Sequence, residues 1–344
     1  MKRRGLLALI AGLFLLSVTV SPSLAQVIKL TLAEQNPEMG WGPVHALKPW
    51  VKKVEEATKG RVKIDVFYAQ TLTKGPDIWN AVKTGVADMG WCFHGYWPDM
   101  TPLSDVITLP SLPIKSAEKG SEVLWKLYEK FPAIQNEYKD VHVLQLWSSN
   151  PYFLITTKKQ VKTMEDLKGL KIRVVGGPPT EQMKALGGIP TLIPMPDTYL
   201  SMDKGVIDGM GAPWEAIIAF RLYEIARYYT IVPLSAVYFS MSMNKQKWES
   251  LPKDIQQAIT SASGLEAAKF WGKNWFDSAE EGAVDLAKKG NYQMIKYAPP
   301  PQELEKWTKA AGEPLWKEWV KKMESRGRPE AQQVLDATLD LLKK

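Results

Sequence analysis

The segment Asp166-Leu-Lys-Gly-Leu-Lys-Ile-Arg-Val174 decides the interpretation of the chain. Thr163 and Asp166 have the spacing of an N-terminal helix cap, and Gly169 suits the end of the short helix that they begin. Residues 170–175 then form a short apolar strand that carries a single arginine, Arg173. A guanidinium held rigidly on such a strand can bind a carboxylate through two parallel hydrogen bonds. The segment therefore predicts an α/β unit with an anion-binding arginine.

Helical and strand patterns alternate on both sides of this segment. After it, residues 180–186 and 196–204 are predicted helices, and residues 188–193 are predicted to be extended. Before residue 150 the pattern is also β-α-β-α, which favours sheets covered by helices on both faces. The predicted strands of that first unit are 29–33, 61–68, 86–91 and 141–147, and its predicted helices are 43–58, 76–84 and 115–131.

The chain then returns to the first unit. Residues 238–244 alternate polar and apolar side chains and predict a strand that rejoins the first sheet. From residue 252 to the end the pattern is almost wholly helical. We expect the tryptophans of this helical region to be packing residues, because they lie far from the α/β crossovers. They are Trp271, Trp275, Trp307, Trp316 and Trp319.

The first 25 residues are predicted to be an export signal. Three basic residues at positions 2–4 precede an apolar stretch at 6–20, and Ser23 and Ala25 are the small residues of a cleavage site. An uncleaved membrane anchor is the alternative, but the apolar stretch is shorter than the roughly 20 residues that a membrane span needs. We expect the mature chain to be a soluble periplasmic protein.

Composition limits the remaining possibilities. The 319 residues from position 26 onward suggest two domains. Three of the 44 lysines and arginines lie in the signal, so the mature chain has 41 lysines and arginines and 37 aspartates and glutamates. These charges are interspersed, and this pattern favours solvated helix faces over a nucleic-acid-binding role. Cys92 is the only cysteine, so no intramolecular disulfide can form.

Enzymatic and metal chemistry have little support in the sequence. The three histidines, His45, His94 and His142, are not at metal-ligand spacing, and no cofactor motif is present. Cys92 and His94 lie two residues apart on a predicted strand, where a buried structural cysteine is favoured over a thiol nucleophile. A hydrolase that uses a pair of acidic residues in a cleft stays open as an alternative of another class.

Several motifs in order resemble the DctP-type solute-binding proteins of tripartite ATP-independent periplasmic (TRAP) transporters. They are Thr58-Lys-Gly-Arg-Val-Lys-Ile64, Gly85-Val-Ala-Asp-Met89, Leu109-Pro110, Asp166 to Val174, and Gly205-Val-Ile-Asp-Gly209. The resemblance implies two α/β lobes that are joined by hinge strands, spanned by a long helix at about 251–289, and close around an organic acid. It assigns 26–149 and 238–275 to the first lobe, and 150–237 and 276–344, including C-terminal helices, to the second.

The resemblance also implies that Arg173 is the carboxylate-binding arginine. An ion pair between Arg173 and Asp208 is the structural alternative. Three departures from the family pattern replace polar contacts. Many members have a second arginine near the position of Phe153, and Phe93 stands in place of an acidic contact of the first lobe. Sialic-acid-binding members have Asp-Gly-Gln-Glu-Asn-Pro where this chain has Asp208-Gly-Met-Gly-Ala-Pro213. A polyhydroxylated acid would leave its hydroxyls unpaired in such a site.

The predicted ligand is therefore a monocarboxylate with an aromatic or apolar body. The candidate walls lie near strand ends or in crossover loops, where cleft residues belong. They are Trp41, Phe93, Trp97, Trp147, Phe153, Met195, Trp214 and Tyr238, and Asn150 completes the set of ligand-binding candidates.

We expect a monomeric receptor that passes its ligand to the subunits of a TRAP membrane permease and catalyses no reaction. A receptor for a four-carbon dicarboxylate or a short sulfonate, using Arg173 with a nearby Asn or Lys, is the alternative within the binding class.

Overall fold

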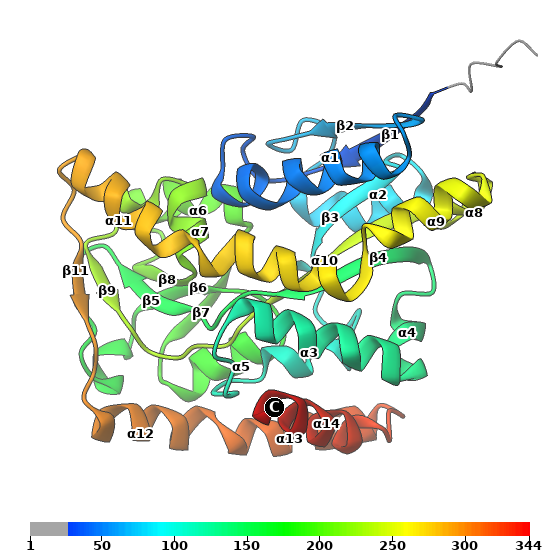
Figure 1. Cartoon of the computed structure of the whole chain (residues 1–344). Helices are drawn as coiled ribbons and strands as arrows, with labels where there is room; N and C mark the ends of the chain where they lie inside the picture. Colours follow the sequence, from blue (N-terminus) through cyan, green and yellow to red (C-terminus); the bar gives the residue numbers. More distant parts are fainter. Residues whose placement is uncertain (1–26) are drawn as a thin grey trace, which may run out of the picture.

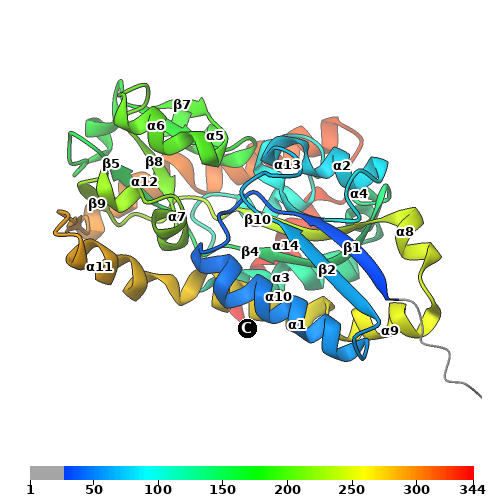
Figure 2. The ribbon, with the colours of Figure 1, turned by 90° about the horizontal axis from the view of Figure 1, so that it is seen from above.

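The computed structural model describes residues 27–344, so the predicted signal at 1–25 lies outside the described residues. Two sheets form the cores of two lobes that lie side by side (Figures 1 and 2). This confirms the predicted two-lobed α/β fold. The first lobe contains a five-stranded sheet in the order β2 (Val62–Phe67), β1 (Ile28–Ala33), β3 (Met89–Phe93), β10 (Tyr238–Asn244) and β4 (Val141–Ser148).

The second lobe contains a six-stranded sheet. Its order is β11 (Ile295–Tyr297), β9 (Tyr228–Thr230), β5 (Phe153–Thr156), β8 (Gly209–Ala212), β6 (Lys171–Val174) and β7 (Ile189–Leu192). In the first lobe, β10 pairs antiparallel with both β3 and β4, as a strand returning from the second lobe must. The predicted return of the chain at 238–244 is therefore confirmed.

Helices cover both sheets. Those of the first lobe are α1 (Lys48–Ala57), α2 (Ile78–Thr84), α3 (Ala117–Lys130), α4 (Pro132–Glu137), α8 (Lys245–Ser250) and α9 (Lys253–Ser261). Those of the second lobe are α5 (Pro178–Ala185), α6 (Thr198–Asp203), α7 (Trp214–Ala219) and α12 (Pro301–Ala311). In the described part of the chain, none of the helices is long and apolar enough to span a membrane.

A long helical segment crosses from one lobe to the other (Figure 1). It consists of α10 (Gly264–Trp271), a π-helical stretch (Gly272–Asp277) and α11 (Ala279–Lys289). The α10 part packs on α3 and β4 of the first lobe, and α11 packs on α7 of the second. The segment begins later than the predicted residue 251, because Gly264 has a φ of +74° and separates α9 from α10.

The C-terminal helices are shared between the two lobes, whereas the prediction assigns all of residues 276–344 to the second lobe. Helix α12 packs on α5 of the second lobe, but α14 (Ala331–Lys343) packs on α3 of the first lobe. Trp319 and Met323 of α13 (Glu313–Ser325) also join the apolar cluster of the first lobe. The structure thus divides residues 276–344 between the lobes, because the apolar face of α14 is buried against the first lobe.

Two extended segments form the hinge beside the spanning helix. The Ser149 backbone N–H donates to the Val237 carbonyl at 2.8 Å, and the Leu234 N–H donates to the Tyr152 carbonyl at 2.9 Å. Gln182 of α5 accepts hydrogen bonds from the backbone and hydroxyl of Ser235. The hinge segments are therefore paired with each other and anchored to the second lobe.

The C-terminal tryptophans are packing residues, as predicted. Trp271 and Trp275 are fully buried in the core of the first lobe, and Trp307 is buried in the second. Trp319 is buried and Trp316 is partly buried against the first-lobe cluster.

Candidate functional site

The local sequence around Arg173 folds as its motifs predict. Thr163 and Asp166 form a reciprocal capping box at the start of a short helical turn, and Gly169 has a φ of +80° after its end. Lys159 and two backbone N–H groups hold the pKa of Asp166 down at about 2. Strand β6 then runs between β7 and β8, with Arg173 opposite Thr191 and Met210. Neighbours on both sides hold the arginine backbone in place.

The Arg173 guanidinium is buried and only partly paired. The residue is 1% exposed, and its Nε donates a hydrogen bond to the Ile193 carbonyl at 3.0 Å. Its Nη2 atom is buried without a hydrogen-bond partner among the described residues. Burial lowers the pKa of Arg173, while Tyr96 and Tyr152 nearby oppose that shift. A buried cation with an unpaired donor is costly unless an anion pairs with it.

Asp208 does not neutralise Arg173. The Asp208 carboxylate accepts a hydrogen bond from the Lys171 backbone N–H at 2.8 Å. The aspartates and glutamates of the described chain supply no ion pair to Arg173, and the titratable residues beside it are Tyr96 and Tyr152, whose pKa values are raised by burial and which are neutral at neutral pH. The structure therefore favours an external anion over the internal ion pair that the sequence left open.

Arg173 lines a cavity of about 150 Å³ between the lobes, which we call the Arg173 cavity. Arg173 is its only charged lining residue, and the other side chains are apolar except for Tyr96. A much smaller cavity of about 20 Å³ lies on the hinge side of Arg173, beside Tyr152 and Gln182. The Arg173 cavity is lined by Pro76, Gly95, Tyr96 and Pro98 of the first lobe and by Arg173 to Gly176 and Leu192 to Pro194 of the second.

Contacts between the lobes surround the Arg173 cavity. The Gly176 N–H donates to the Gly95 carbonyl at 3.0 Å, and the Met195 N–H donates to the Tyr96 hydroxyl at 2.9 Å. The same hydroxyl donates to Gln35 at 2.8 Å. A side chain on Gly176 would begin only 2.9 Å from Pro98, so the backbones approach closely here. Tyr96 thus joins the first lobe to the second directly beside Arg173.

Replacing Tyr96 with phenylalanine is expected to weaken ligand binding about 10-fold. The change leaves the Met195 N–H unpaired in the closed arrangement, at a cost of about 1–3 kcal/mol. Small-angle scattering at saturating ligand should then report a larger open fraction than in the parent. Tyr199→Phe is the matched control, because the Tyr199 hydroxyl binds Glu224 within one lobe. Affinity of Tyr96→Phe within twofold of the parent would contradict this role.

Two buried carboxyl groups lie near the hinge side of this region. Glu34 follows β1 in the first lobe, and Glu215 begins α7 in the second; they are 1% and 5% exposed. Burial raises the pKa of each to about 8, and Glu215 contributes to the shift of Glu34. One oxygen of each carboxyl is buried without a partner among the described residues. Both groups are therefore expected to be mainly protonated at neutral pH.

These carboxyls make stability depend on pH. Between about pH 4.5 and 8 the folded state keeps protons that the unfolded state has lost, so the free energy of unfolding falls as pH rises through this window. Glu215→Gln removes one such group. In urea unfolding, the variant should gain at least about 1 kcal/mol on the parent between pH 5 and pH 8. The exposed Glu249→Gln is the control, and a pH-independent difference for Glu215→Gln would refute the assignment.

Three of the candidate wall residues are packed inside the first lobe. Trp147 is fully buried among core aromatics, and Tyr238 stacks on His94 while its hydroxyl donates to Asp105. Phe93 contacts Phe239 and meets the Tyr96 ring edge-on at a centroid distance of 4.8 Å. Phe93 therefore supports a residue of the Arg173 cavity, whereas Trp147 and Tyr238 lie outside its lining.

The other candidates are distributed around the second lobe and the lobe boundary. Phe153 and Trp214 pack together with their ring centroids 4.4 Å apart, and Met195 belongs to the same apolar cluster. Trp41 stacks on His45, and Asn150 has a buried Oδ1 without a partner among the described residues. The Trp97 indole donates to the Pro76 carbonyl. Of all the candidates, Arg173 alone lines the Arg173 cavity directly.

Tyr96 and Tyr152 were not among the sequence candidates, although both lie beside Arg173. Tyr96 stands within the aromatic run 91–97, and Tyr152 stands next to Phe153. The candidates beside them, Phe93, Trp97 and Phe153, have more apolar side chains, which the predicted apolar wall favours. The better signal was a tyrosine at a strand end, because its hydroxyl can hydrogen-bond across a cleft while its ring lines an apolar wall.

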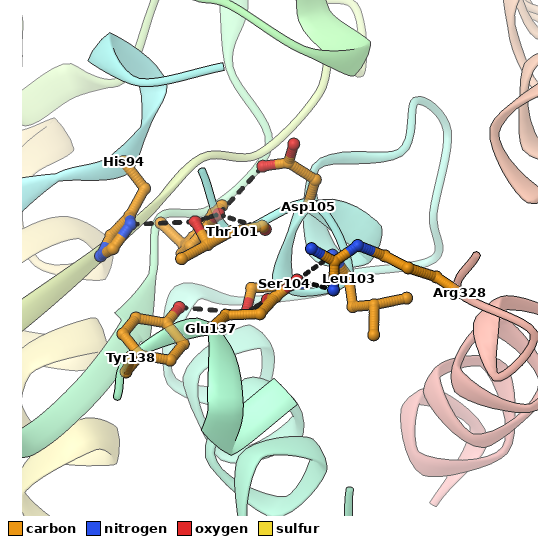
Figure 3. A network of polar contacts seen from close by, with 9 residues as sticks. His94, Thr101, Leu103, Ser104, Asp105, Glu137, Tyr138 and Arg328 are labelled. Carbon is orange, nitrogen blue, oxygen red and sulfur yellow. Dashed lines mark hydrogen bonds and ion pairs between the residues drawn. The ribbon is translucent and has the colours of Figure 1, made fainter. Parts of the chain in front are cut away.

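Cys92 and His94 form no catalytic pair. Burial raises the pKa of the Cys92 thiol to about 12 and lowers the pKa of His94 to about 3. The His94 ring bonds instead with Thr101, as Figure 3 shows, and with Ser240, and all three residues are buried. Both residues are structural, as expected for the cysteine. The described residues also hold no cluster of three metal-ligating side chains.

Comparison with known proteins identifies the family. Residues 42–322 match the family described as bacterial extracellular solute-binding protein, family 7, or DctP. The chain belongs to this family. A relative named outer membrane transporter protein TsaT, from Comamonas testosteroni, is 30% identical over 93% of this chain and 92% of its own length.

Solved structures of TRAP solute-binding proteins are similar over nearly the whole chain. One from Rhodoferax ferrireducens, in complex with copurified benzoate, is 27% identical with a TM-score of 0.86; the match covers 92% of this chain and 98% of that one. A marine metagenome protein described as specific for aromatic acid ligands, in complex with 3-hydroxybenzoate, is 31% identical with the same TM-score and coverage.

The protein is therefore a TRAP solute-binding receptor and not an enzyme. Receptors of this family work with a membrane permease, and a periplasmic location is expected for them. The DctP receptor has the two lobes, hinge and spanning helix that its sequence predicts.

Proposed function

We propose that this receptor captures a small monocarboxylate with an aromatic or apolar body and delivers it to its TRAP permease. The proposal depends on one observation above all. The buried Arg173 Nη2 has no partner among the described residues, and Arg173 lines a cavity between the lobes. A ligand carboxylate at this position would pair with the guanidinium, each charge-assisted hydrogen bond contributing about 1.5–3 kcal/mol.

The size and lining of the cavity support a small ligand with one charge. Its volume of about 150 Å³ is below the roughly 300–1,000 Å³ of pockets that hold drug-sized molecules. Arg173 is the only ionic side chain of the lining. Leu192, Ile193 and Val175 offer no partner to a second carboxylate or to several hydroxyls. A flat ring would instead be favoured by about 25 cal/mol for each Å² of apolar surface that it buries.

The ligands of similar proteins agree with this chemistry. Benzoate and 3-hydroxybenzoate occupy two TRAP receptors that are 27% and 31% identical to this chain. The roles proposed for Phe93, Trp214, Phe153 and the other aromatic candidates stay predictions. We also propose that the receptor is a monomer. Its N-terminal signal directs export and is then removed by cleavage.

A thermal-shift screen tests the ligand assignment. Benzoate, 3-hydroxybenzoate, branched aliphatic acids, glucuronate, succinate and a short sulfonate should be compared at equal concentration. A ligand at 100 times its dissociation constant adds about 2.7 kcal/mol of stability. The aromatic acids are expected to raise the melting temperature most. The largest shift from glucuronate, succinate or the sulfonate would reject the proposed ligand class and leave the receptor assignment intact.

A further inference from the structure

A second and larger cavity lies between the lobes next to the C-terminal helices. We call it the lateral cavity; its volume is about 520 Å³. Pro98 and Leu109 of the first lobe, Gly177 and Leu192 of the second, and Trp319 and Met323 of α13 are among its lining residues. Most of this lining is apolar. Three parts of the chain that are distant in sequence thus build one apolar cavity at the lobe boundary.

Four carboxyl groups line the lateral cavity; Asp99, Glu181 and Glu318 are exposed, and only Asp105 is half-buried. Asp105 forms no ion pair with the described residues. Its Oδ1 accepts a hydrogen bond from the Tyr238 hydroxyl at 2.9 Å. Its Oδ2 faces the second lobe, 3.3 Å from the position that a side chain on Gly177 would occupy. Figure 3 shows the Asp105 carboxyl pointing away from Arg328. A half-buried carboxyl group in a largely apolar wall is suited to a cation that also has an apolar body.

The basic residues near Asp105 are engaged elsewhere. Lys322 of α13 lines the lateral cavity, but its Nζ pairs with Asp99 at 3.5 Å, and Arg326 pairs with Asp99 as well. Arg328 approaches Glu137 at 3.7 Å. Burial raises the pKa of Asp105 to about 7, and the nearby Glu137 and Asp99 add to the shift while Tyr238 and Lys322 oppose it. A bound cation would restore the charged form of Asp105.

We propose that the lateral cavity binds an organic monoammonium ion with a flat apolar body, and that its ammonium group pairs with Asp105. The ammonium supplies three donors, of which one can reach the free carboxylate oxygen. Leu109, Leu192 and Met323 cover the apolar body.

Occupation of the lateral cavity is coupled to acid binding. Pro98, Gly176 and Leu192 line both this cavity and the Arg173 cavity. Because both lobes contribute walls, an amine in the lateral cavity favours the closed arrangement, and so does an acid at Arg173. Each ligand therefore raises the affinity of the other by the same factor. This coupling, unlike the amine site itself, rests on the proposed function.

Calorimetric titration of the mature protein with phenethylamine tests the site. The parent is expected to bind saturably, and Asp105→Asn, which keeps an acceptor for Tyr238, is expected to lose at least 10-fold in affinity. Glu318→Gln removes an exposed carboxylate of the same cavity and should stay within threefold of the parent. Should Asp105→Asn fail to fold, Leu315→Trp fills the cavity from a half-buried position and is expected to abolish binding.

Further measurements separate this proposal from the acid site. Affinity for phenethylamine should rise between pH 6 and pH 8, because Asp105 must be ionised to pair with the amine. Arg173→Lys should still bind phenethylamine even where acid binding is lost. In the parent, saturating 3-hydroxybenzoate should tighten phenethylamine binding severalfold. Equal affinities of the parent and Asp105→Asn, or the absence of saturable binding at millimolar phenethylamine, would overturn the proposal whether or not the acid binds.

Discussion

Arg173→Lys is expected to lower the affinity for 3-hydroxybenzoate at least about 30-fold while the fold survives. Lysine keeps the positive charge, but it loses the planar fork that presents parallel donors to a carboxylate. It also loses the Nε bond to the Ile193 carbonyl that fixes the orientation of the guanidinium. A loss of about 2 kcal/mol or more corresponds to this change in affinity.

Calorimetry on the folded variant measures the effect. Arg221→Lys is the matched control, because Arg221 is an exposed arginine whose partner, Glu224, lies three residues away on the surface. The control should bind like the parent. Affinity of Arg173→Lys within threefold of the parent would remove Arg173 from the ligand site, and circular dichroism would establish that both variants are folded.

An aromatic monocarboxylate is expected to bind at least about 100-fold more tightly than a diacid of similar length. One carboxylate of the diacid can pair with Arg173, but the second must enter a cavity whose other lining side chains carry no charge. Burying an unpaired carboxylate costs several kcal/mol, which exceeds the gain from any extra apolar contact of a short chain.

A calorimetric series in one buffer tests this selectivity. It should include benzoate, phenylacetate, a branched aliphatic acid, succinate and a short sulfonate, titrated into the parent protein. The aliphatic acid controls for apolar area without a ring. Tighter binding of succinate or the sulfonate than of every aromatic acid would contradict the predicted ligand class.

The fold could be predicted where local patterns determine structure. The capping box of Thr163 and Asp166, the turn at Gly169 and the β10 alternation depend on neighbours within a few residues. The end of the chain could not be divided correctly between the lobes. An amphipathic helix such as α14 shows which face is buried, but it does not show which lobe buries it.

A lone arginine on an apolar strand and the family resemblance together single out Arg173 in the sequence, and its role in ligand binding stays a prediction. The surroundings of Arg173 could not be predicted in the same way. Tyr96 was missed because its hydroxyl meets the Met195 N–H of the other lobe only when the lobes come together. Aromatic residues such as Trp147 are of the types that line apolar ligand sites, yet Trp147 packs in the core. Core burial and ligand contact favour the same side chains, so the sequence does not distinguish the two.

A crystal structure of the mature protein with 3-hydroxybenzoate tests the central claim most directly. The account predicts a carboxylate oxygen within about 3 Å of Arg173 Nη2, the aromatic ring in the Arg173 cavity, and the Tyr96 bond to the Met195 N–H retained. A ligand bound elsewhere, with its carboxylate held by other residues and Arg173 Nη2 still unpaired, would contradict it.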